Sequence, residues 1–199
     1  MNSIRSALKR LREFDALVGI NEIARRYFAM NAFDGALTII GVVMGNLVAG
    51  VGNTRIVIST GLSTSIAMGI SGLWGAYLTE SAERDREMDE LSRVTLVEMK
   101  KTRIGRASRL AVLIVALVDG ISPFMTAVII LIPFFFASLF PSLQTVYFTS
   151  LTVALVVLFL LGVFLGRVSG KSWIGFGIRT VLAGIFSILI AFLLGSEGA

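Results

Sequence analysis

The chain has 199 residues, of which 55% are hydrophobic and 16% charged, and its formal net charge is +5. A soluble globular domain is less apolar than this, and apolar runs of about 20 residues recur along most of the chain, which is typical of membrane-spanning helices. The absence of cysteine and histidine excludes disulfides, thiolate or imidazole metal sites and Ser-His catalysis. The positive charge favours loops that face anionic lipid over a nucleic-acid partner, so we expect no nucleic acid.

The N-terminal segment, residues 1–30, carries six basic side chains and no compact apolar core, so it does not resemble a cleavable signal peptide. Ile4, Leu8 and Leu11 share one helical face, with basic residues around them. This pattern predicts a cytoplasmic amphipathic helix, lying either on the membrane surface or in solvent.

Five apolar segments follow, each long enough to cross a bilayer: 33–52, 56–78, 110–138, 146–166 and 174–194. The third contains Pro123 and Pro133, which predicts a kink or a break. We therefore expect an all-α polytopic membrane protein, with helices 1–2 within residues 31–78 and helices 3–5 within residues 110–199.

The basic residues between these segments predict the orientation. Six lie before the first span, eight lie within 79–109 and two within 167–173, whereas the turn at 139–145 has none. Because positively charged loops stay in the cytoplasm, the N-terminus is predicted inside and the C-terminus outside. The same alternation requires an odd number of spans, which agrees with five.

The longest polar stretch is "TESAERDREMDELSRVTLVEMKK", residues 79–101. It follows the second span without Gly or Pro, so the second helix is predicted to continue into a short cytoplasmic Glu-rich segment at 79–109. At about 100° per residue, five glutamates fall on one face: Glu80, Glu83, Glu87, Glu90 and Glu98. Such spacing lets carboxylates share one cation, with Met88 and Met99 as neighbouring soft donors. The alternative is a solvated helix with Glu–Arg pairs.

Of the thirteen acidic residues, only Asp34 and Asp119 lie within the predicted spans, and each precedes a glycine. An ionisable residue at membrane depth suggests function. Asp119 lies ten residues past Arg109, about 15 Å along a helix at about 1.5 Å per residue. Asp34 is nearer the end of its span, where it is either a gate ligand or a solvated helix cap.

The same depth arithmetic puts Met44 and Met68 near the level of Asp119, and Asp34 near the level of Glu80. Carboxylate and thioether donors suit a borderline divalent ion such as Fe²⁺, although methionine in a membrane helix also serves as plain packing. A desolvated carboxylate tends to hold a proton, and a bound cation would expel it. The pattern therefore predicts metal–proton exchange.

Three stretches, "NAFDGALTIIGVVMGNLVAG", "SIAMGISGLWGAYLTESAERDREMDEL" and "LGVFLGRVSGKSWIGFGIRTVLAGIFSILIAFLLG", resemble the vacuolar iron transporter family, which includes prokaryotic relatives. The resemblance covers most of residues 25–105 and 155–195. It implies a five-span homodimer in a prokaryotic plasma membrane, exporting Fe²⁺ or Mn²⁺ from the cytosol by proton antiport, with no cofactor besides the transported ion.

By the same resemblance, Asp34 and a second-span methionine line the path at the dimer interface. Met68 matches that methionine approximately, because the neighbouring family position reads Ile66. The chain departs from the family in having Gly69-Ile70-Ser71 where a Gly-Glu-Tyr or Gly-Glu-Phe is common, and in its short cytoplasmic segment.

The combined prediction is a metal pathway formed by eight residues: Asp34, Met44, Met68, Asp119, Glu80, Glu83, Glu87 and Glu90. The alternative is a membrane structural or interaction protein whose acidic cytoplasmic helix docks a partner without transport. An enzyme is not expected, because neither intramembrane Asp is followed by the further Asp residues that Asp-Gly lipid-headgroup transferases need.

Overall fold

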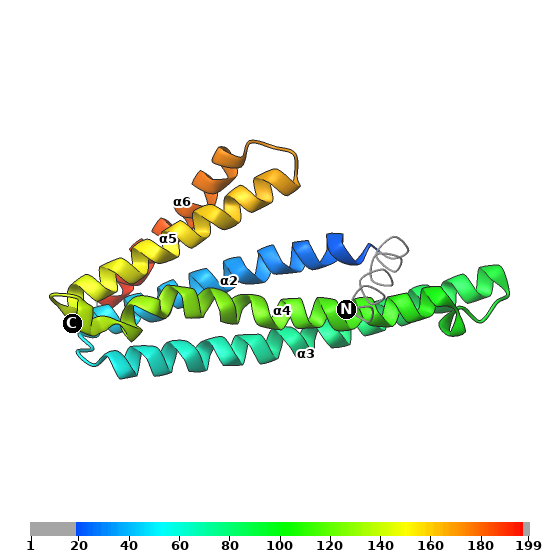
Figure 1. Ribbon diagram of the computed structural model, residues 1–199, viewed down its shortest axis with the longest axis horizontal. Helices are drawn as coiled ribbons and strands as arrows, with labels where there is room; N and C mark the ends of the chain where they lie inside the picture. Colours follow the sequence, from blue (N-terminus) through cyan, green and yellow to red (C-terminus); the bar gives the residue numbers. More distant parts are fainter. Residues whose placement is uncertain (1–18, 197–199) are drawn as a thin grey trace, which may run out of the picture. The chain divides into compact units, whose positions relative to one another are not determined.

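The structure is a computed structural model that describes residues 19–196, so the predicted apolar face of Ile4, Leu8 and Leu11 lies outside the described residues. Within the described residues there are only helices, as the sequence predicted. They are, in chain order, α2 (Ile20–Val48), α3 (Thr54–Thr95), η1 (Met99–Lys101), α4 (Arg103–Phe135), η2 (Ala137–Leu139), α5 (Leu143–Val168) and α6 (Trp173–Ser196) (Figure 1).

Five of these helices, α2 to α6, are long and apolar enough to cross a membrane, which confirms the predicted number of spans. The continuation of the second helix is confirmed too, because α3 runs unbroken for 42 residues through the Glu-rich stretch. Helix α2 begins at Ile20, well before the predicted start at residue 33, since apolar runs mark the membrane core and not the helix ends. Of the kink or break predicted at the two prolines, the break does not occur, because α4 continues through both Pro123 and Pro133, and the kink stays a prediction.

The chain divides into two compact units. The described part of unit 1 comprises residues 19–28 and 70–121, and that of unit 2 comprises residues 29–69 and 122–196. The helices α2, α3 and α4 each contribute one segment to each unit.

Unit 2 has an apolar core to which α2, α3, α4 and α5 all contribute. Its fully buried side chains include Ile39, Ile40, Val43, Val57, Ile130, Leu131, Phe134, Val146 and Leu158. Polar groups inside it are paired, because the Ser150 hydroxyl donates to the Ile130 carbonyl at 2.7 Å and the Tyr147 hydroxyl donates to the Val51 carbonyl at 3.0 Å. Between apolar helices in lipid, such close packing and hydrogen bonds are the main stabilising interactions.

Two pairs of glycines, each spaced four residues apart as in closely packed membrane helices, have different surroundings. At Gly162 and Gly166 a Cβ atom would lie 2.6 Å from the Cα atoms of Gly177 and Trp173, respectively, so α5 and α6 are in backbone contact there. Figure 1 shows these helices side by side in one hairpin. At Gly41 and Gly45, by contrast, a Cβ atom would meet nothing within 4 Å. Within the part of the chain that the structure describes, a side chain at either position would therefore have room.

Unit 1 contains a helical hairpin, in which the end of α3 and the start of α4 are joined by the η1 turn (Figure 1). Leu96, just past α3, takes a left-handed backbone conformation with φ of 57°, which ends the helix without a glycine. Gly105 on α4 makes the return possible, because a Cβ atom there would lie 2.6 Å from the carbonyl oxygens of Met99 and Lys100.

Candidate functional site

Asp34 lies on α2 in unit 2 and is exposed on the surface of the single chain. Among the described residues it makes no hydrogen bond or ion pair. The next residue, Gly35, is buried against α4, where a Cβ atom would lie 2.7 Å from the Pro123 Cα and 2.9 Å from the Pro123 carbonyl oxygen. Helix α2 thus packs against α4 on the side of Gly35, and the Asp34 carboxylate lies on another side of α2, which is open.

That open side continues along α2 as a face of small residues. Gly41 and Gly45 lie seven and eleven residues after Asp34. At about 100° of rotation per residue, each glycine points within about 20° of the direction in which Asp34 points, so all three lie on one face of α2. A groove of about 650 Å³ runs along this face and the end of α6, and it is lined by Gly41, Gly45, Val48, Ala49, Ala191, Leu194 and Gly195. We call the surface formed by Asp34, Gly41 and Gly45 the open face of α2.

The two predicted thioether ligands occupy different environments within unit 2. Met44 is only 3% exposed and belongs to the hydrophobic core, as the packing alternative for methionine predicted. Met68, on α3, is half-buried. Within residues 19–196 neither sulfur is in contact with the Asp34 carboxylate, so the role of both methionines as metal ligands stays a prediction.

Asp119 lies on α4 in unit 1 and is 5% exposed. Its carboxylate packs against Gly72 of α3, where a Cβ atom would lie 2.8 Å from Asp119 Oδ2 and 3.2 Å from the Asp119 carbonyl oxygen. Pro123 has no N–H for that carbonyl four residues earlier, so the helical hydrogen bond at this point is missing. The sequence did not identify Gly72 as the neighbour that makes room for Asp119.

The predicted glutamate row on α3 is largely paired with arginines. Arg84 contacts Glu80 at 3.8 Å and Glu87 at 3.1 Å, and Arg86 contacts Glu90 at 3.1 Å. Glu80 also accepts a hydrogen bond from the Tyr27 hydroxyl at 2.9 Å. These are the Glu–Arg pairs of the solvated-helix alternative.

Within residues 19–196, no three acidic side chains come close enough together to hold a metal ion. Glu83 is exposed on the same helix and has no pairing partner among the described residues. Metal binding by the glutamate row and by the two aspartates therefore stays a prediction, which needs ligands from beyond a single described chain or a rearrangement of the arginines.

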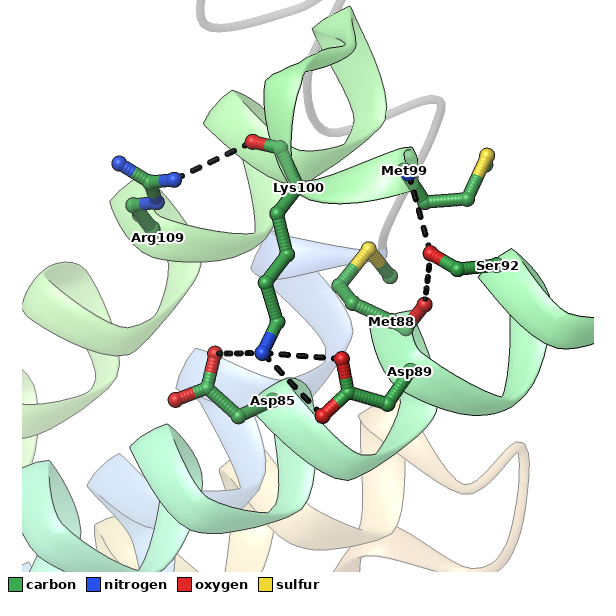
Figure 2. Close-up of polar contacts among 7 residues, drawn as sticks. All are labelled: Asp85, Met88, Asp89, Ser92, Met99, Lys100 and Arg109. Carbon is green, nitrogen blue, oxygen red and sulfur yellow. Dashed lines mark hydrogen bonds and ion pairs between the residues drawn. The ribbon is translucent and has the colours of Figure 1, made fainter. Parts of the chain in front are cut away.

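The hairpin of α3 and α4 is closed by Lys100, to which the sequence pattern assigned no role. Lys100 Nζ lies between two carboxylates of α3, 3.0 Å from Asp89 Oδ1 and 3.6 Å from Asp85 Oδ1 (Figure 2). The Arg109 guanidinium donates to the Lys100 carbonyl at 3.1 Å, and the Met99 amide donates to the Ser92 hydroxyl oxygen at 3.0 Å (Figure 2). The η1 turn is thus fastened to both helices.

Beneath this lysine is a small cavity of about 30 Å³ between α3, η1 and α4. Its lining combines charged, hydroxyl and thioether groups: Ser81, Arg84, Asp85, Met88, Lys100, Gly105, Ser108, Arg109 and Val112. The Ser108 hydroxyl is buried there without a hydrogen-bond partner. A polar cavity of this size is large enough for one water molecule, which would satisfy that hydroxyl.

The pairing of Lys100 predicts a pH dependence of the hairpin. The hydrogen bond to Asp89, with the charges of Asp85 and Asp89, raises the pKa of Lys100 above its ordinary value of 10.5. Because the folded-state pKa is the higher one, the stabilisation is complete below pH 10.5 and is lost as the pH rises through the raised pKa. In an NMR titration of ¹³Cε-labelled lysine, we expect Lys100 to titrate at higher pH in the wild type than in an Asp89→Asn variant.

The matched control for this titration is Glu98→Gln, which removes the partner of Lys101 at 2.7 Å and leaves the Lys100 contacts in place. The Lys100 titration should not move in that variant. An equal shift in Asp89→Asn and Glu98→Gln would mean that general charge, and not the contact in Figure 2, sets this pKa.

Comparison with known proteins decides the family. The sequence matches the profile of the VIT family over residues 26–103 and 95–196. The chain belongs to the VIT family. It is also 30% identical, over 176 residues, to the uncharacterized protein MJ0645 of Methanocaldococcus jannaschii, an alignment that covers 87% of this chain and 89% of that protein.

Membership of the VIT family implies transport of metal ions across a membrane, and VIT members are transporters and not enzymes. The five apolar helices fit an integral membrane protein in a lipid environment. The two matched segments overlap at residues 95–103, which include the η1 turn between α3 and α4. The match therefore divides within the stretch 79–109, which was predicted to be a short cytoplasmic segment.

Proposed function

We propose that this VIT-family chain exports a divalent metal ion, Fe²⁺ or Mn²⁺, from the cytosol in exchange for protons, and that it does so as a homodimer. The observation that carries the proposal is the exposed Asp34 carboxylate, which has no partner among the described residues although it lies on a helix apolar enough to span a membrane. A charged side chain facing lipid is costly, so residues of this kind face a bundle interior or a water-filled path.

A second copy is the partner that best covers the open face of α2. Glycines spaced four apart let two membrane helices approach closely, and a Cβ atom at Gly41 or Gly45 would meet nothing within 4 Å among the described residues. In the proposed dimer the Asp34 carboxylates of both copies line one path. A carboxylate can bind either a proton or a metal ion, so the two ions compete for it. Because binding of one releases the other, transport of the metal ion is coupled to transport of protons.

The test is transport in proteoliposomes, with Mn²⁺ as an oxidation-stable substrate and a pH-sensitive dye as the proton reporter. We expect Asp34→Asn to lower the initial rates of Mn²⁺ and proton movement together, by at least about tenfold, because the amide removes the charge that balances the cation. The control Lys101→Gln, which alters one exposed ion pair, should transport at the wild-type rate.

Two outcomes would contradict the proposal. If Asp34→Asn transports at the wild-type rate, the carboxylate is not part of the path. If the wild type neither moves nor binds Mn²⁺, the alternative of a membrane interaction protein, whose acidic helix docks a partner, becomes the better one.

A further inference from the structure

The turn between α5 and α6 carries three cations without acidic partners. Arg167 lies in the last turn of α5, Lys171 in the connection, and Arg179 in the second turn of α6. All three are exposed, and among the described residues none of them forms an ion pair. The reason is in the sequence, because residues 120–196 contain no Asp or Glu. Some other anion is needed to balance these charges at a membrane surface.

Aromatic rings hold two of the guanidinium groups. Arg167 lies 6.0 Å from the ring centroid of Trp173, and Arg179 lies 5.6 Å from that of Phe176. Cation–π contacts of this kind orient a guanidinium while leaving its N–H groups available to an acceptor. Trp173 is 46% exposed at the first residue of α6, and tryptophan is enriched at the level of the lipid headgroups.

The backbone beneath these side chains is closely packed. A Cβ atom on Gly166 would lie 2.6 Å from the Trp173 Cα, and the Thr180 hydroxyl donates to the Leu158 carbonyl at 2.7 Å. Gly170 makes the turn in a left-handed conformation with φ of 64°. The two helices therefore present the cations from one fixed hairpin, visible as α5 and α6 in Figure 1.

The position of Arg179 restricts which kind of anionic partner can bind at this turn. It is the seventh residue of a helix that is apolar enough to span the membrane, so its stem lies among acyl chains while its charge must reach toward the headgroups. A soluble acidic protein would not reach a guanidinium at that level, whereas the phosphodiester of a lipid lies at the required depth.

We propose that Arg167, Lys171, Trp173 and Arg179, here called the basic turn, form a binding site for the headgroup of an anionic phospholipid. Arg167, which lies against Trp173, and Lys171 donate hydrogen bonds to the phosphodiester, and Arg179, six residues after Trp173 on α6, extends toward the same headgroup from the acyl-chain side. Basic clusters at this end of a helix pair favour the leaflet that is rich in anionic lipid, in keeping with the predicted cytoplasmic side.

The chain offers a local reporter for this site, because it has only two tryptophans. In a Trp74→Phe background, Trp173 is the sole tryptophan, can be excited selectively over the three tyrosines, and is itself in the basic turn. The protein is reconstituted in bilayers of phosphatidylcholine and phosphatidylglycerol, with one or the other lipid brominated, and quenching of Trp173 measures which lipid lies beside it. We expect brominated phosphatidylglycerol to be preferred severalfold, with about a fivefold contribution per cation at low salt.

Arg179→Gln and Lys171→Gln should each reduce the preference, and Arg179→Lys, which keeps the charge, should retain most of it. The matched control is Arg55→Gln, an exposed cation at the start of α3, which should change nothing. Millimolar inorganic phosphate should not abolish the preference, because a free anion lacks the acyl chains that bring the lipid to Trp173.

Equal quenching by brominated phosphatidylcholine and phosphatidylglycerol would overturn the proposal. So would a preference that Arg179→Gln and Lys171→Gln leave unchanged, or one that inorganic phosphate removes. None of these outcomes depends on metal transport, so the experiment can contradict the lipid site without contradicting the proposed function, and the transport test can contradict the proposed function without contradicting the lipid site.

Discussion

Gly35→Ala is expected to destabilise the folded protein by about 3 kcal/mol, at the upper end of the usual cost of overpacking. The new methyl group would lie 2.7 Å from the Cα and 2.9 Å from the carbonyl oxygen of Pro123. These are backbone atoms of a proline inside α4, so no side-chain rotation can relieve the contact and the two helices must separate. The measurement is the free energy of unfolding in mixed micelles, from an SDS titration.

The matched control for Gly35→Ala is Gly75→Ala on α3, where a Cβ atom would meet nothing within 4 Å. That variant should be neutral or slightly more stable, since alanine is favoured over glycine in a helix by about 1 kcal/mol. Equal stability of the two variants would mean that α2 and α4 are not in backbone contact at Gly35.

Gly72→Ala is expected to lower metal transport by about tenfold through its effect on Asp119, a drop equivalent to about 1.4 kcal/mol of transition-state free energy. The added methyl group would lie 2.8 Å from Asp119 Oδ2 and 3.2 Å from the Asp119 carbonyl oxygen, so the carboxylate must leave its position. This follows from the prediction that Asp119 takes part in transport. Initial rates of Mn²⁺ uptake into proteoliposomes provide the measurement.

A double-mutant cycle separates this positioning effect from simple loss of packing. If Gly72 acts through Asp119, then Gly72→Ala causes no further loss in an Asp119→Asn background. An equal loss in both backgrounds would show that Gly72 matters only for packing. Wild-type transport rates in both Gly72→Ala and Asp119→Asn would mean that Asp119 takes no part in transport. Gly75→Ala again serves as the control.

The sequence predicted the features that depend on local composition. The five spans, the uninterrupted passage of α3 through residues 79–95 and the turn around Pro141 all follow from apolar length and the positions of proline. Of the kink or break predicted at Pro123 and Pro133, the break does not occur, because α4 continues through both prolines, as membrane helices often tolerate.

The sequence could not reveal which residues meet across large separations. Gly35 and Pro123 are 88 residues apart, and nothing in either neighbourhood points to the other. Lys100 reaches Asp85 and Asp89 only because Leu96 reverses the chain in a left-handed conformation, which is rare for leucine.

Helical spacing correctly grouped the glutamates of α3, but it could not assign their partners. Arg84 lies between Glu80 and Glu87 through the choice of side-chain rotamer, which sequence periodicity does not specify. For the same reason, the four-residue spacing of Gly41 and Gly45 allows a close approach of helices without specifying which helix approaches.

The open face of α2 has a consequence for stoichiometry. A face that meets its own copy across a two-fold axis brings each residue near the axis opposite itself. In the proposed dimer, the Asp34 side chains of the two copies would therefore face each other. The dimer would then have one shared conduit, and not a separate conduit in each subunit. Symmetry would then allow a single substituted subunit to impair the function of its unaltered neighbour.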